Sequence, residues 1–257
     1  MPLFRPPSTK GDFFMSKKVL NYKESEQRLK NLVMAAIFSS LAYAAMTATG
    51  WIKVQFLTFD AKDTVITIAG LVLGPVYSVV ISFLVAFIEF ITVSETGPYG
   101  FLMNFASSAV FSFVCALVYK YKKNIKGAIT ALISGVLSVT AFMVLFNLFI
   151  TPLYMGGTTA DVAKMIPTLL LPFNLTKATM NGALVLILYK PISNVLKAAR
   201  MLPQTKRVAE GTDEDIQKEK KREHLKFSLV VTVVGLVVVA LCLFVFFVLL
   251  KGNISFT

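Results

Sequence analysis

The sequence predicts an all-α integral membrane protein with a six-helix core, whose second helix is short, and one extra C-terminal transmembrane helix. Composition is the first reason: of the 257 residues, 56% are hydrophobic and only 16% are charged, and the mean hydropathy is +0.70. A soluble domain carries roughly 25% charged residues, so this chain cannot cover a water-facing surface. The second reason is that apolar stretches of about 20 residues, the length that crosses about 30 Å of hydrocarbon, recur along the chain.

The first apolar stretch spans 32–48 and follows a polar, basic segment. It begins too late in the chain and is too long for a cleavable signal peptide. The next stretch, 64–93, contains Gly74-Pro75, a pair that interrupts a helix and permits a turn. The remaining stretches are 102–119, 127–153, 165–189 and 227–250.

The distribution of basic residues decides how often stretch 64–93 crosses the membrane. Lys and Arg concentrate in 1–30, 120–126 and 190–226, which hold 7, 4 and 10 of them. Basic segments stay on the cytoplasmic side, and all three do so only if 64–93 crosses twice, with a cytoplasmic turn at Gly74. The sequence therefore predicts seven membrane segments, with the N-terminus in the cytoplasm and the C-terminus outside.

The second of these segments is too short to cross by itself. Residues 63–74 would extend about 17 Å as a helix. We expect a partial or tilted helix that is partly buried in protein, because irregular backbone at that depth must avoid lipid. Short, interrupted segments of this kind often line a substrate cavity.

These boundaries predict five regions. They are a cytoplasmic N-terminal segment (1–30, with Met15 as an alternative start), a six-helix membrane core (31–190), a charged cytoplasmic linker (191–226), an additional transmembrane helix (227–250) and a tail (251–257). We expect the linker to form a short solvated helix; the alternative is a contact with a cytoplasmic partner.

Several functional classes are excluded. The net charge of +12 could indicate nucleic-acid binding, but the basic residues lie between apolar runs, where they set topology. Cys115 and Cys242 lie inside apolar runs and His224 is the single histidine, which leaves too little material for a disulfide or a metal site. We expect no cofactor.

Motifs for catalysis are also missing from the sequence. It has no phosphate-binding Gly-rich loop, no HExxH and no serine elbow. The chain is therefore predicted not to be an enzyme and not to hydrolyse ATP itself. Its scattered carboxylates, which we expect to be too dispersed to form a pair, are Asp60, Asp63, Glu89 and Glu95.

Polar residues within the sixth segment are the main candidates for ligand binding, because such residues in a membrane core are functional by default. Asn174, Lys177 and Asn181 share one helix face. Lys177 lies about 18 Å into the membrane and needs a partner. The face suits a ligand with several carbonyls or hydroxyls; the alternative is that Lys177 pairs with Glu89 to hold helices together.

Two further amides and one loop complete the candidate site. Asn147, flanked by aromatic residues, and Asn104 are predicted to face the outer half of the membrane. An amide both donates and accepts hydrogen bonds, and a neighbouring Phe stacks on planar rings; the alternative is an interhelical hydrogen bond for each. The loop 51–63 mixes aromatic and charged residues and either caps an outward-facing site or is an ordinary interfacial loop.

The first segment carries a small residue at every fourth position. Such a strip lets two helices approach closely, and Ala35 and Ser39 widen it. The four positions are Ala36, Ser40, Ala44 and Ala48.

Two stretches carry a resemblance to a known family. Phe59-Asp60-Ala61-Lys62-Asp63 through Gly70-Leu71-Val72-Leu73-Gly74-Pro75 resembles the substrate-specific S components of energy-coupling factor (ECF) vitamin transporters. Leu171-Pro172-Phe173-Asn174-Leu175-Thr176-Lys177, together with Leu188-Tyr189-Lys190-Pro191, is similar to the riboflavin-specific members. The resemblance covers about 30–197.

The resemblance implies a multi-pass protein of the bacterial cell membrane that binds riboflavin from outside. Its implied partners are a transmembrane coupling subunit, contacted through Ala36 and Ser40, and two cytoplasmic ATPases. The implied flavin site comprises Asn147, Asn174 and Lys177, with Phe59 and Asp60 nearby, and Asn104 is a further candidate. The charged linker and the seventh helix depart from the family pattern.

Two other functions stay open at this point. One is an S component for another vitamin or a precursor. The other is a stand-alone secondary transporter, in which Glu89 and Lys177 would form an ion or proton relay.

Overall fold

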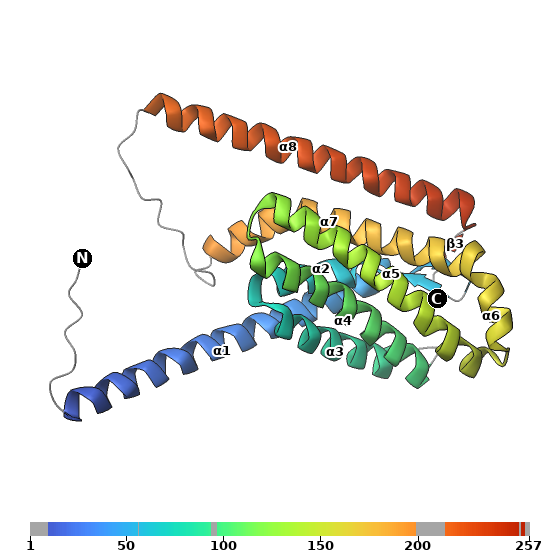
Figure 1. Cartoon of the computed structure of the whole chain (residues 1–257), viewed down its shortest axis with the longest axis horizontal. Coiled ribbons are helices and arrows are strands. Elements are labelled where there is room, and N and C mark those ends of the chain that lie inside the picture. The colour runs from blue at the N-terminus through green and yellow to red at the C-terminus, as the bar shows by residue number, and fades with distance from the viewer. Residues whose placement is uncertain (1–9, 56, 94–96, 199–213, 252, 255–257) are drawn as a thin grey trace.

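The computed structural model describes residues 10–55, 57–93, 97–198, 214–251 and 253–254. Its helices form a bundle, and the C-terminal helix lies alongside the helix that precedes it in the chain (Figure 1). The helices are α1 (Lys10–Thr49), α2 (Lys62–Leu73), α3 (Pro75–Thr92), α4 (Gly97–Tyr121), α5 (Ile125–Met155), α6 (Thr159–Met165), α7 (Leu171–Ala198) and α8 (Glu214–Phe244). Two π-helical stretches, η1 (Ile166–Leu170) and η2 (Val245–Leu249), follow α6 and α8, and three short strands are β1 (Ile52–Val54), β2 (Leu57–Phe59) and β3 (Asn253–Ile254).

Six helices among the described residues are long and apolar enough to cross a membrane. Together with the short α2 they give the predicted six-helix core and the additional C-terminal helix. The all-α fold class is therefore confirmed. The spans are Glu24–Thr49, Pro75–Thr92, Gly97–Tyr121, Lys126–Met155, Thr159–Tyr189 and Leu229–Val248.

The break between α2 and α3 lies where the sequence predicts it. Gly74 adopts a φ of 106°, a left-handed conformation that glycine adopts without a steric penalty. Pro75 then begins α3, a position where its missing N–H is not needed. The 12 residues of α2 extend about 18 Å, so α2 is short, as predicted.

Helix α2 lies at the centre of the bundle and packs against α1, α3, α4 and α7. Every residue from Lys62 to Gly70 is buried. The apolar side chains at its centre, including Ile66 and Ile68, are completely shielded. After its charged first turn α2 is mostly apolar on all sides, and such a helix is stable only inside a core. So short a segment therefore needs the surrounding long helices.

The loop predicted at 51–63 contains a β-hairpin that the sequence analysis missed. β1 and β2 pair antiparallel with Val54 opposite Leu57, and β3 pairs with the other edge of β1. Gln55 in the tight turn has a φ of 52°. Such turns usually carry Asn-Gly or Asp-Gly, so the sequence gives no hairpin signal here.

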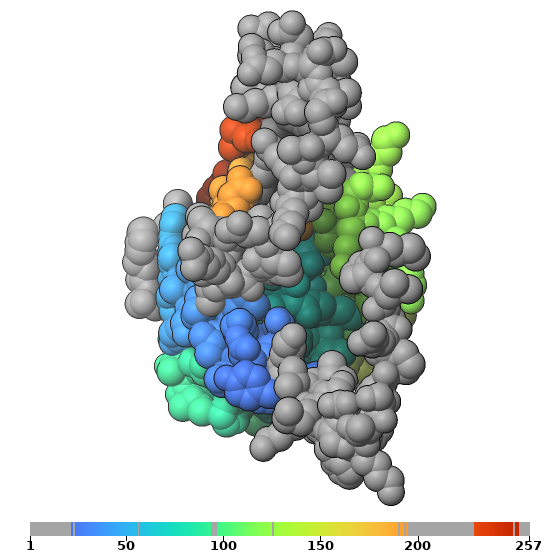
Figure 2. Space-filling view, turned by 90° about the vertical axis from the view of Figure 1, so that its left-hand side faces the viewer, coloured from blue at the N-terminus to red at the C-terminus, as the bar shows by residue number. Residues whose placement is uncertain are grey.

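Helix α1 is longer than the predicted stretch 32–48. It begins at Lys10 and continues without interruption to Thr49, and its first part extends beyond the bundle (Figure 1). Figure 2 views the molecule from this end, where blue residues of α1 lie at the surface, with teal residues between them and the light-green start of α5. The polar N-terminal segment is thus helical over its described residues and joined directly to the first span.

Close contact between α4 and α5 gives a test of the packing. A Cβ at Gly135 would collide with Cys115 Sγ and lie 3.2 Å from the ring of Phe111, whereas a Cβ at Gly182 would have only ordinary contacts at 3.8 Å or more. We expect Gly135→Ala to lower the free energy of unfolding by about 1 to 3 kcal/mol through overpacking. Gly182→Ala is the matched control. Equal thermal midpoints for both variants in detergent would contradict this packing.

Candidate functional site

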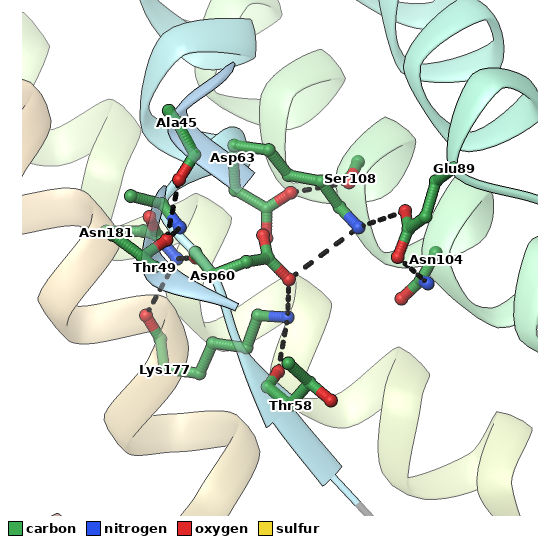
Figure 3. A network of polar contacts seen from close by, with 12 residues as sticks. Ala45, Thr49, Thr58, Asp60, Asp63, Glu89, Asn104, Ser108, Lys177 and Asn181 are labelled. Atoms are coloured by element: carbon green, nitrogen blue, oxygen red, sulfur yellow. Dashed lines mark hydrogen bonds and ion pairs between the residues drawn. The ribbon is translucent and has the colours of Figure 1, made fainter. Parts of the chain in front are cut away.

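The polar residues of the membrane core converge where the hairpin meets α2 and α7 (Figure 3). Lys177 Nζ from α7 lies 2.9 Å from Asp60 Oδ2 and donates to the Thr58 carbonyl at 3.2 Å. The alternative that Lys177 pairs with Glu89 is therefore wrong. Asp60 lies directly after β2 and comes closer to α7, so it supplies the partner that a buried ammonium group needs.

Glu89 of α3 pairs with a different lysine. Lys62 Nζ lies 2.6 Å from Glu89 Oε2 and 3.6 Å from Asp60 Oδ2. Asn104 of α4 donates to Glu89 Oε1 at 2.7 Å. Lys62 is only 1% exposed, so its charge depends on these two carboxylates for compensation.

Asp63 extends the cluster to α4, because Ser108 Oγ donates to Asp63 Oδ1. The expectation that the carboxylates are too dispersed to meet is therefore wrong for Asp60, Asp63 and Glu89, which gather around Lys62. The cause is α2, whose first turn enters the core with its charged residues buried. Glu95 lies outside the described residues.

The junction between the hairpin and α2 is also held by its backbone. Asn181 Nδ2 donates to the Asp60 carbonyl at 3.2 Å, and Asn181 Oδ1 accepts from Thr64 Oγ1 at 2.6 Å. The Ala61 N–H donates to Thr49 Oγ1 at 2.9 Å. Helices α1, α2 and α7 are thereby joined to one short stretch of chain.

One acceptor in this cluster has no partner. Asp60 Oδ1 is buried and accepts no hydrogen bond from the described residues. Burial raises the pKa of the Asp60 carboxyl, but the ammonium groups of Lys177 and Lys62 outweigh burial and hold that pKa below its usual value. An ionised carboxylate oxygen without a donor is costly inside a protein, so this atom suits a donor from a bound ligand.

Two other predicted site residues, Asn174 and Asn147, form their hydrogen bonds within their own helices in the described part of the chain. Asn174 donates to the Leu170 carbonyl at 2.8 Å within its own helix. Asn147, fully buried in α5, donates to the Met143 carbonyl at 2.7 Å and accepts from Thr151. Phe59 is buried one residue before Asp60.

The strip of small residues on α1 divides between two faces. Ala36, Ser40, Ala44 and Ala48 are exposed, whereas Ala35 and Ser39, which were expected to widen the strip, are buried against the bundle. Ser40 Oγ donates to the Ala36 carbonyl, so its hydroxyl is satisfied without a partner helix. The exposed strip is narrower than predicted and smooth enough for a second helix to approach.

Comparison with known proteins identifies the family. Residues 30–192 match the family model of the substrate-specific component of ECF transporters. The chain belongs to this family of ECF S components. The family is not enzymatic, in agreement with the prediction from the missing motifs.

Two curated relatives of this S component are distant in sequence, but the chain matches each of them over nearly its whole length. The chain is 27% identical to the riboflavin transporter RibU of Staphylococcus aureus (strain TCH60) over 183 residues, which are 68% of this chain and 96% of that protein. It is 25% identical to the riboflavin transporter FmnP of Bacillus subtilis (strain 168), covering 64% of this chain and 94% of that protein.

A solved S component of a bacterial ECF transporter shares the fold. It aligns with a TM-score of 0.56 at 24% identity, covering 66% of this chain and 99% of that one. The family model ends at residue 192, so α8 and β3 are additions to the matched part of this S component.

Sequence reasoning missed four members of the charged cluster in this S component. Lys62 and Asp63 were noted among the charged residues of the loop 51–63 but were not assigned to the site. Ser108 has no signal in the sequence, because serines in membrane helices usually bond to their own backbone. Asn181 was placed on the correct helix face but was not assigned to the site. The members are Lys62, Asp63, Ser108 and Asn181.

The ion pairs of Lys62 predict a large stability effect. Lys62→Ala leaves Glu89 and Asp60 without their shared cation, and breaking a buried pair costs about 3 to 5 kcal/mol. Lys164→Ala is the control, since the side chain of Lys164 is 78% exposed and a surface pair contributes about 0 to 1 kcal/mol. We expect thermal unfolding in detergent to shift strongly only for Lys62→Ala. Equal shifts would argue against the buried cluster.

Proposed function

We propose that this S component captures riboflavin outside the cell and delivers it inward, using the ATPases of an ECF module. The observation that carries the proposal is the similarity to two riboflavin transporters over nearly their whole length. The chemistry of the cluster supports it. Riboflavin combines a flat ring, a dione edge with an imide N–H, and a polyhydroxyl chain, all of which need matched donors and acceptors.

In this proposal the ligand is bound where the hairpin meets α7. The ammonium of Lys177 donates to ligand oxygens, and the unpartnered Oδ1 of Asp60 accepts from a ligand N–H or O–H. Asn174 and Asn147 exchange their bonds within their helices for bonds to the ligand. Phe59 contributes apolar surface, and Asn104 acts through Glu89 and Lys62.

The proposed orientation places the start of α1 in the cytoplasm and the C-terminus outside. Figure 1 shows α1 and α8 running in the same direction, so the described end of α8 lies at the end of the molecule opposite the start of α1. This arrangement supports an odd number of membrane segments, as the distribution of basic residues predicts.

The site assignment predicts the loss of flavin binding in two variants. The wild-type protein in mild detergent should carry a flavin absorbance or quench added riboflavin fluorescence at a near one-to-one ratio. Lys177→Ala and Asn174→Ala should each weaken binding about tenfold to a hundredfold, because each removes donors to the ligand. Lys164→Ala, on the exposed surface of α6, should bind like the wild type.

Three results would redirect this proposal. Wild-type affinity in both variants would contradict the site. A wild-type protein that does not bind riboflavin but binds another compound in a competition panel would move the substrate to another vitamin or precursor. Uptake by the chain alone in proteoliposomes under an ion gradient would contradict the need for ATPase partners.

The exposed strip on α1 is proposed to contact the transmembrane coupling subunit. A large side chain would keep the two helices apart, since close approach depends on small residues. We expect Ala36→Trp or Ser40→Trp to reduce co-purification with ECF subunits about tenfold without changing riboflavin affinity. Leu145→Trp, which places the same ring at a 60% exposed position of α5, should retain the complex. Retention in all three variants would exclude the strip as the interface.

A further inference from the structure

The C-terminal addition reaches back to the hairpin that carries the site. β3 pairs antiparallel with β1, with Ile254 opposite Ile52 and Asn253 opposite Lys53. The hairpin thus becomes the three-stranded sheet β2-β1-β3. Because the family model ends at residue 192, this third strand comes from outside the matched core.

A single aromatic side chain fixes the same segment to the core. Phe246 in η2 is 1% exposed. Its ring lies edge-on to Phe59, with centroids 6.2 Å apart, and 6.0 Å from Phe173 of α7. Aromatic pairs at these separations contribute beyond the area they bury. The surrounding apolar cluster includes Ile52, Val54, Leu169, Met180 and Cys242.

The two rings that Phe246 contacts are neighbours of site residues. Phe59 directly precedes Asp60, and Phe173 directly precedes Asn174. The carbonyl of Thr58, in the same strand as Phe59, accepts from Lys177. Phe246 therefore contacts the chain neighbours of two site residues, Asp60 and Asn174, and is not itself part of the charged cluster.

The hairpin needs this support for a physical reason. β1 and β2 have only three residues each, and an isolated two-stranded hairpin is marginally stable at best. Helix α8 is seated closely on α7: a Cβ at Gly235 would lie 2.8 Å from Ile187 Cγ1. Because α8 packs closely on α7, η2 and β3 reach the hairpin in a defined position.

We propose that α8, η2 and β3 form a positioning element that holds the hairpin in its ligand-binding geometry, with Phe246 as its main contact. Ligand exchange then requires this element to separate from the hairpin. The effect on riboflavin rests on the proposed function; the effect on the hairpin does not. The exposed strip on α1 lies on another helix and stays accessible to a partner.

The test compares Phe246→Ala with Phe244→Ala, a matched control two residues earlier, at the end of α8, where the side chain is 59% exposed. Two measurements are made on the full chain in detergent: hydrogen–deuterium exchange over residues 51–59 without ligand, and the rate at which bound riboflavin dissociates. For Phe246→Ala we expect exchange in the hairpin and riboflavin dissociation each to become about tenfold faster. Phe246→Leu should lie between, and Phe244→Ala should match the wild type.

Two further variants test the element, one by weakening its contact with the core and the other by fixing that contact. Gly235→Leu should push α8 off α7 and reproduce the effect of Phe246→Ala. Lys53→Cys combined with Asn253→Cys places a thiol on each of two paired positions, and oxidation to the disulfide should slow riboflavin dissociation about tenfold relative to the reduced form.

The outcomes separate this proposal from the proposed function. Unchanged hydrogen exchange in the hairpin of both Phe246→Ala and Gly235→Leu overturns the positioning element, whatever the ligand is. If the protein binds riboflavin, faster exchange in the hairpin with an unchanged rate of riboflavin dissociation overturns the effect of the positioning element on the ligand. A wild-type chain that does not bind riboflavin contradicts the proposed function, while the exchange measurement still decides the positioning role.

Discussion

The compensation of buried charge around Lys62 and Lys177 is the constraint on which the rest of the structure depends. Two ammonium groups and three carboxylates lie in the core of a membrane protein, where an uncompensated charge is expensive. Each ammonium has a carboxylate within 3 Å. These pairs require the hairpin, α2, α3 and α7 to meet at one place, so the charges specify how the apolar helices are arranged.

The short helix α2 is the means by which these charges enter the core. A helix that crossed the membrane completely would place its first turn at the interface, where Lys62 and Asp63 would be hydrated. Helix α2 instead begins inside the bundle, directly after the hairpin, so Lys62 and Asp63 in its first turn are buried, and it ends at the break at Gly74. A charged site at that depth is compatible with the bilayer because the long helices α1, α3, α4 and α7 shield it from lipid.

The chain consists of a core that matches the family and a C-terminal addition that lies outside the match. The matched residues 30–192 supply the S-component core, which carries every member of the charged cluster. Helix α8 and β3 add apolar contacts to the side of the core where the hairpin lies, and contribute no member to the charged cluster. An addition of this kind can alter how the site opens without altering which groups line it.

The sequence by itself determined the membrane class, the break at Gly74, the short second helix, the extra C-terminal helix and the need of Lys177 for a partner inside the core. Apolar length, glycine–proline chemistry and helical periodicity are local properties, so they can be read along the chain. Only the tertiary structure decided that Lys177 pairs with Asp60, that Lys62 pairs with Glu89, and that Gln55 turns a hairpin which β3 completes. The ion pairs and the pairing of β3 join residues far apart in the chain, and their choice depends on distances between helices that no local pattern contains. The hairpin turn is local, but it has none of the residues that usually predict such a turn.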